Sequence, residues 1–175
     1  SVLVVGAGPI GLAVVQSLLL VGGRPAVTDV NPDRLAFCAQ AFPQIQGLAA
    51  GEALPELLRD RFSGDLPTLV FDCTGSRSAM MRSFSLVAPG GKLVFVGLFI
   101  GEVSFDDPEF HKREMTLLGS RNATARDFRA VIEGMESGRI AAQSWVTHRT
   151  SSDQLIDAFP AWLRQPALRK AMIEW

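Results

Sequence analysis

The first residues able to do chemistry are three glycines with the spacing of a phosphate-binding loop. They lie in Gly6-Ala7-Gly8-Pro9-Ile10-Gly11, directly after the apolar run Val2–Val5. In such a loop the first glycine permits a tight turn, the second lets the backbone approach a pyrophosphate, and the third lets a helix pack closely on the sheet. A glycine-rich turn in an ordinary α/β core can show the same spacing by chance. The neighbouring segments must therefore separate the two interpretations.

Those neighbours favour a dinucleotide site. An apolar segment from Leu12 to Val21 follows the loop, Gly22-Gly23 ends it, and a second apolar run, Pro25 to Thr28, leads to Asp29. Strand, glycine loop, helix, strand and acid thus follow one another within about thirty residues, as a dinucleotide-binding unit requires. The free N–H groups of the helix would face the phosphates. The Asp29 carboxylate could accept hydrogen bonds from both hydroxyls of an adenosine ribose.

The scaffold for this site is predicted to be a doubly wound parallel six-stranded sheet, a Rossmann fold. Further strands are predicted near residues 45–47, 66–72, 92–96 and 115–119. Helices are predicted near 32–41, 52–62, 76–87, 108–114 and from 124 to about 137, and 103–105 has a short β-like pattern. Strands that alternate with helices favour a parallel sheet covered on both faces. Ligands then bind beyond the carboxyl ends of the strands, where the turn Cys73–Gly75 falls.

The last part of the chain has a different pattern. It contains a predicted strand at Gln143–His148, a capping box at Ser151–Gln154, an amphipathic helix at Leu155–Leu163 and a final strand at Lys170–Trp175. A strand after the sixth has no place in the standard order, so this strand–helix–strand tail is expected to form another sheet. We predict a dinucleotide-binding domain over 1–142 and a tail over 143–175.

Composition narrows the function classes. Seventeen basic and eighteen acidic residues nearly cancel, which argues against nucleic acid and anionic membranes as partners. Cys38 and Cys73 are too few for a disulfide scaffold or a cysteine zinc site, and they fit a reduced, cytoplasmic setting. No base is near Cys73 in the sequence, so we interpret it as a packing residue. Ser1 directly precedes the first strand without a signal peptide, which suits a chain cut from something longer.

Taken together, these residues resemble the medium-chain, zinc-dependent alcohol and polyol dehydrogenases. The likeness rests on the order and spacing of several segments and covers essentially the whole chain. The matching segments are Val4–Gly11, Asp29 with Arg34 and Leu35, Phe71–Gly75, Ala88–Gly91, Val96-Gly97, Lys112–Glu114 before Leu117–Ser120, and Trp145–Arg149. Within the family, the chain looks most like bacterial sorbitol-, galactonate- or idonate-type enzymes.

The resemblance implies an oxidoreductase that transfers hydride from a secondary alcohol of a polyol or sugar acid to NAD, working as a homo-oligomer. It also implies the cofactor contacts. The pyrophosphate and the near side of the nicotinamide would be held by Gly6, Gly8, Pro9, Ile10 and Gly11. The adenosine ribose would be held by Asp29, adenine would be flanked by Val30 and Arg34, and the adenine-side wall would be formed by Cys73, Thr74 and Gly75. The other side of the nicotinamide would be met by Val96, Gly97, Leu98, Ser120 and Arg121.

The expected zinc chemistry lies outside this chain. Such enzymes hold zinc with Cys, His and Glu side chains of an N-terminal catalytic domain, whereas His111 and His148 here have no second ligand at metal spacing. The chain resembles the coenzyme domain with a tail that returns to that absent domain, so no catalytic or metal-binding residue is predicted and the chain alone should be inactive. Two alternatives are a freestanding NAD-binding regulatory module and a methyltransferase, which also opens on a glycine-rich turn and an acid.

Overall fold

The computed structural model of the chain describes residues 1–165 and 168–175. These residues form two compact units, Ser1–Asn122 and Ala123–Trp175. The predicted boundary after residue 142 lies inside the second unit, and the functional division of the chain at that point stays a prediction. None of the described helices is long and apolar enough to cross a membrane.

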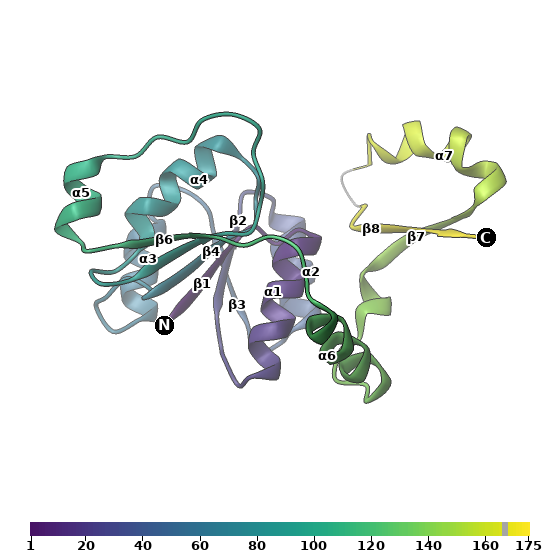
Figure 1. The fold of residues 1–175 in the computed structure, drawn as a ribbon, viewed down its shortest axis with the longest axis horizontal. Coiled ribbons are helices and arrows are strands. Elements are labelled where there is room, and N and C mark those ends of the chain that lie inside the picture. Colours follow the sequence, from purple (N-terminus) through teal and green to yellow (C-terminus); the bar gives the residue numbers. More distant parts are fainter. Residues whose placement is uncertain (166–167) are drawn as a thin grey trace. The chain divides into compact units, whose positions relative to one another are not determined.

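The first unit is built on the predicted six-stranded parallel sheet, in the order β3-β2-β1-β4-β5-β6 (Figure 1). Its strands are β1 (Val2–Val5), β2 (Ala26–Asp29), β3 (Gln46–Ala49), β4 (Leu69–Asp72), β5 (Lys92–Phe95) and β6 (Thr116–Gly119). The chain leaves β1 for β2 on one side and later returns to place β4 on the other. The strand order therefore reverses between β1 and β4, the position where open α/β sheets bind ligands.

Helices cover both faces of this sheet (Figure 1). They are α1 (Pro9–Leu20), α2 (Pro32–Ala41), α3 (Leu54–Arg61), α4 (Arg77–Ser83), which continues into the 3₁₀ turn η1 (Phe84–Leu86), and α5 (Asp107–Lys112). Local chemistry sets the start of α2, because the Asn31 side chain accepts hydrogen bonds from the N–H groups of Asp33 and Arg34 and Pro32 is the first helical residue. This start is where the sequence predicted it.

A continuous core fixes the α3 and α4 side of the sheet. Leu3, Leu58 and Leu93 are fully buried in it, and Leu86 is almost completely buried. Burial of each such side chain contributes about 1.5–3 kcal/mol relative to an exposed one. The sheet and the helices that frame its carboxyl edge are therefore held rigidly.

The predicted β-like segment at Val103–Phe105 is wrong. No strand forms there: Val103 packs against the core, and the Phe105 ring stacks on Phe84 with 4.7 Å between centroids and lies 5.0 Å from Phe110. Aromatic packing draws the segment onto the core and leaves its backbone without a partner strand. The strand at this end of the sheet is β6.

The first helix of the second unit is α6 (Ala125–Glu136), which starts directly after Thr124, where the sequence predicted a helix. Thr124 and Asp127 form a reciprocal capping box. Hydrogen bonds from the Thr124 backbone and then its hydroxyl lower the pKa of the Asp127 carboxyl. The remaining elements are η2 (Ala142–Trp145), β7 (Val146–Ser151), η3 (Ser152–Gln154), α7 (Leu155–Trp162) and β8 (Lys170–Glu174).

Strands β7 and β8 pair in parallel as a separate two-stranded sheet, as predicted. Two local expectations are wrong. Residues 142–145 form a 3₁₀ turn rather than the start of a strand. The capping box at Ser151–Gln154 is also absent, since Ser151 precedes η3 without a side-chain cap hydrogen bond. The 3₁₀ turn η3 leads directly into α7, so helical backbone already precedes its first residue.

Candidate functional site

The glycine loop between β1 and α1 leaves open space where a ligand could lie. Gly6 has a φ of +97°, which a residue with a side chain rarely adopts. A Cβ atom at Gly11 would overlap the carbonyl oxygen of Gly6, so no larger residue fits there. A Cβ atom at Gly8, in contrast, would meet only the Arg34 Nη1 atom, at 3.9 Å. Gly6 and Gly11 therefore set the backbone path of the loop, and the missing side chain of Gly8 leaves space beside the loop for a ligand.

The N-terminus of α1 has no side chain that satisfies or neutralises it. Gly8 occupies the N-cap position, no side chain caps the helix, and its first turn contains no acidic residue. The N–H groups and the positive end of the helix dipole thus remain available to an anion. Helix and open loop together can cradle a phosphate or pyrophosphate.

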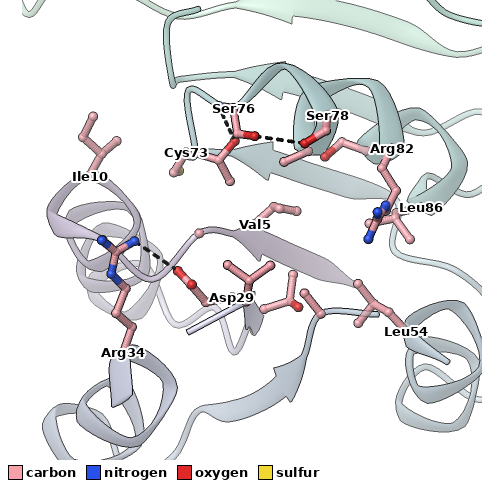
Figure 2. Close-up of a pocket in the computed structure, with 18 of the residues that line it drawn as sticks. Val5, Ile10, Asp29, Arg34, Leu54, Cys73, Ser76, Ser78, Arg82 and Leu86 are labelled. Atoms are coloured by element: carbon pink, nitrogen blue, oxygen red, sulfur yellow. Dashed lines mark hydrogen bonds and ion pairs between the residues drawn. The ribbon is translucent and has the colours of Figure 1, made fainter. Parts of the chain in front are cut away.

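Asp29 lies beside this loop with its side chain only 4% exposed. Its carboxylate accepts hydrogen bonds from the N–H of Ala7 at 2.7 Å and of Asn31 at 2.8 Å. The Arg34 guanidinium lies 3.7 Å from Asp29 Oδ2, and Figure 2 shows this pair at one side of the cavity. Asp29 therefore fixes the glycine loop to the end of β2, a structural role that the sequence analysis did not predict.

These elements enclose a cavity of about 460 Å³ at the carboxyl edge of the sheet. Nine of the predicted site residues line it: Gly6, Gly8, Pro9, Ile10, Asp29, Val30, Arg34, Cys73 and Thr74. They come from the ends of β1, β2 and β4 and the helices that follow. The cavity thus brings together most of the predicted phosphate, ribose and adenine contacts.

The other predicted residues lie outside this cavity. Val96 lines a separate apolar groove together with Pro9, Ile10 and Phe71. Gly75 and Gly97 pack against each other, because a Cβ atom on Gly97 would overlap the Gly75 nitrogen. Gly11 lies behind the loop, and the exposed residues Leu98, Ser120 and Arg121 line neither the cavity nor the groove.

Cys73 is a packing residue on the wall of the cavity. Its side chain is buried, and burial, followed by the charge of Asp72, raises the pKa of its thiol to about 12. Burial raises the pKa of the Cys38 thiol to about 11. Both groups are therefore protonated near neutral pH, which removes the thiolate that nucleophilic chemistry needs.

Asp72 organises the cavity wall, and the sequence analysis assigned it no role. Its fully buried carboxylate accepts hydrogen bonds from the Thr74 N–H at 2.9 Å, the Thr74 hydroxyl at 2.7 Å and the Ser83 hydroxyl at 2.7 Å. Its carbonyl oxygen accepts from the N–H groups of Val96 and Gly97, each at 2.9 Å. One residue thus ties the end of β4 to α4 and to the loop after β5. The sequence feature that could have indicated this role is the position of Asp72, an acidic residue at the end of an apolar strand.

The structure adds a wall from α4 that was also not predicted. Ser76, Ser78 and Arg82 line the cavity, with the two serine hydroxyls 3.2 Å apart (Figure 2). Ser78 and Arg82 are one helical turn apart and so share a face of α4. The hydrophobic pattern of this helix could have indicated which residues share this face, but not that the face lines a cavity.

The described residues do not form a metal centre. No three His, Cys, Asp or Glu side chains come together among residues 1–165 and 168–175. His111 lies 3.9 Å from Asp107, and the His148 ring lies 2.9 Å from the Thr147 hydroxyl. The donor set of this part of the chain therefore does not fit zinc.

Comparison with known proteins agrees with this geometry. The protein family described as zinc-binding dehydrogenase matches residues 9–137. L-galactonate-5-dehydrogenase of Escherichia coli K12 is 44% identical over 149 residues, which cover 85% of this chain and 44% of that protein. D-xylulose reductase of Scheffersomyces stipitis is 28% identical over 90% of this chain and 46% of its own length.

Solved structures share the fold. An oxidoreductase/dehydrogenase of unknown specificity from Escherichia coli has a TM-score of 0.90 and 26% identity, over 99% of this chain and 50% of its own. A short chain alcohol dehydrogenase from Escherichia coli CFT073, crystallised with NADH, has a TM-score of 0.86 and 24% identity, over all of this chain and 52% of its own.

The chain spans about half the length of the curated relatives it matches. The family match extends from the first helix of the glycine-loop unit to the end of α6, and the 44% identical relative covers most of the same residues. The chain belongs to the zinc-binding dehydrogenase family.

Proposed function

We propose that this chain is an NAD(H)-binding domain. The observation that carries the proposal is the open glycine loop at the uncapped N-terminus of α1, beside the buried carboxylate of Asp29. The loop and helix end suit a pyrophosphate, and the acid suits a ribose diol. NADH is also bound in the crystal structure of the related fold from Escherichia coli CFT073.

The cavity and the apolar groove suggest where the two halves of the cofactor bind. In the proposed arrangement the cavity takes the adenosine half, with Asp29 at the ribose and Val30 and Arg34 beside the base. The apolar groove of Pro9, Ile10 and Val96 suits the nicotinamide. Gly97, Leu98, Ser120 and Arg121 are assigned to the same side by family resemblance.

For the full-length protein we propose an NAD-dependent, zinc-type dehydrogenase that oxidises a secondary alcohol of a polyol or sugar acid. The bound nicotinamide would supply the hydride acceptor. This chain would bind and orient the cofactor, while zinc and most substrate contacts would lie in sequence beyond it. Family membership favours this function over a methyltransferase or a freestanding regulatory module. Two protonated, buried cysteines fit the proposed cytoplasmic setting.

Ligand titration tests the NAD(H) proposal. The purified chain should bind NADH saturably in a fluorescence titration and should not bind S-adenosylmethionine. Gly8→Val should abolish NADH binding without loss of stability, because its side chain would fill the space assigned to the pyrophosphate while Gly8 has an ordinary φ of −74°. Gly119→Val is the matched control, since its Cβ would also lie in open space but outside the loop. Wild-type chain that binds no NADH would refute the proposal.

A further inference from the structure

One charged side chain in the cavity is not used by the contacts assigned above. Arg82 lines the cavity from α4, and its guanidinium forms no ion pair with any described residue. The other cavity arginine, Arg34, is paired with Asp29. Figure 2 shows the Arg82 guanidinium beside Leu86, directed into the space between α4 and Leu54. An unpaired cation thus lies at one wall of the cavity.

Thr28, another residue that lines the cavity, has a side-chain hydroxyl without a hydrogen-bond partner. Thr28 is 1% exposed, and its Oγ1 atom is buried without a hydrogen-bond partner. Its neighbours across the sheet, Val5 and Leu48, are apolar and offer it none. A buried hydroxyl without a partner costs about 1–3 kcal/mol of folding free energy. The Oγ1 atom is itself inaccessible from the cavity, so the kind of ligand is inferred from the wall residues instead.

The remaining walls decide the kind of ligand. Leu54, Leu86, Ala50 and Ala79 line the cavity with apolar surface, which suits a flat ring rather than a hydrated anion. Guanidinium groups stack on aromatic planes and donate hydrogen bonds to ring nitrogens, and they are only weakly hydrated. The base of a dinucleotide is attached to the ribose assigned to Asp29, and Leu54 and Arg82 line the same cavity as Val30 and Arg34, so a base that lies beside Val30 and Arg34 has this wall within the same cavity.

We propose that Arg82 contacts the adenine base, which it holds against the apolar wall of the cavity. This inference rests on the proposed NAD(H) binding. Arg82 and Ser78 lie one turn apart on α4, so the helix presents a guanidinium and a hydroxyl to the base together. Asp72 positions this helix through its hydrogen bond to Ser83.

Calorimetric titration of Arg82→Met with ADP-ribose tests the proposal. Methionine keeps the apolar stem and removes the guanidinium. We expect the dissociation constants of ADP-ribose and NADH to rise roughly threefold to tenfold, the usual effect of one lost hydrogen bond or cation–π contact. Reduced nicotinamide mononucleotide, which lacks the adenine base, should bind Arg82→Met as it binds wild type. The melting temperature should not change, because Arg82 is exposed.

Arg59→Met is the matched control, since Arg59 is an exposed helix arginine of the same unit that does not line the cavity. It removes the same charge and should leave all three affinities unchanged. Arg82→Met that binds ADP-ribose as wild type does, or that loses the mononucleotide in parallel, would overturn the base contact. In both cases the proposed function stands, because wild-type chain still binds NADH. Wild-type chain that binds neither NADH nor ADP-ribose would refute both proposals.

Discussion

At the scale of single residues, one carboxylate serves both the loop and the proposed ligand. Asp29 is held by the N–H groups of Ala7 and Asn31, so its position is set before any ligand arrives. Two oxygens with about four acceptor sites can keep these bonds and still accept ribose hydroxyls. Arg34, 3.7 Å away, is the nearest cation at this rim. Coenzyme choice should therefore depend on these two side chains.

Asp29→Asn tests this dependence. Wild-type chain should prefer NADH, because the Asp29 carboxylate repels a 2′-phosphate. The variant should bind NADH more weakly by about 1–3 kcal/mol, the cost of a lost charge-assisted hydrogen bond. It should bind NADPH better than wild type, because Arg34 is released from its ion pair. Fluorescence titration with both coenzymes measures the change, and equal affinity of wild type for NADH and NADPH would contradict the assignment.

Thiol reactivity gives a second test at this scale. With a pKa of about 12, Cys73 should have only about one thiol in ten thousand ionised near pH 8, so alkylation by iodoacetamide should be slow. The rate should rise as the pH approaches the pKa, since the thiolate reacts. Mass spectrometry after timed labelling measures this, and the urea-unfolded chain, which should label quickly, is the control. Rapid labelling of the native chain would show an exposed or activated thiol.

At the scale of elements, β6 is one of the two edge strands of the six-stranded sheet. Thr116 and Ser120 donate their N–H groups inward, to the carbonyls of Gly91 and Phe95. Because a strand alternates, the N–H of Leu117 points away from β5. An edge with free donors can pair with a second copy. We therefore predict that the homo-oligomer expected from the family resemblance forms through this strand.

Leu117→Pro tests the edge directly. Proline removes only the outward donor, so the bonds of β6 to β5 should survive while a self-associated wild type shifts toward monomer. Sedimentation velocity measures the assembly, and an unchanged melting temperature would show that the sheet is intact. Leu117→Val, which keeps the N–H group, should associate as wild type does. Wild-type chain that is already monomeric at high concentration would refute the contact.

At the scale of the whole molecule, we expect this chain to bind NADH without catalysing the oxidation of an alcohol. The proposed NADH contacts all lie within the first unit, on one rigid sheet edge. Oxidation of an alcohol by the proposed full-length enzyme would need a Lewis acid that stabilises the alkoxide and a site closed against water. The described residues offer no cluster that could hold such a metal. Cofactor binding should thus be a property of this chain, and catalysis a property of the longer protein.

The purified chain should therefore bind NADH but oxidise no polyol, sugar acid or simple alcohol, with or without added zinc. The absorbance of NADH, followed with saturating NAD and each alcohol, should stay flat. Saturable NADH binding in the same preparation shows that the chain is folded. Zinc-dependent turnover by these 175 residues would contradict the prediction that this chain binds the cofactor but does not catalyse the reaction.

The sequence by itself determined the features that depend on neighbouring residues. Strands appear as apolar runs, the start of α2 follows from Asn31 and Pro32, and the glycine loop and Asp29 lie within one βαβ unit. Backbone geometry and side-chain caps act over a few residues, so their patterns can be seen in the printed order. The six-strand topology followed because crossover connections between parallel strands allow few arrangements.

Only the tertiary structure decided contacts between residues far apart in sequence. Asp72 meets Ser83 through the packing of α4 on the sheet, Arg82 faces Leu54 across a cavity, and Phe105 is drawn onto Phe84 instead of joining a strand. The local sequence does not identify these partners, because the same apolar or charged residue fits several environments. The burial of the whole core selects among them, and it is this packing that gives the candidate site its walls.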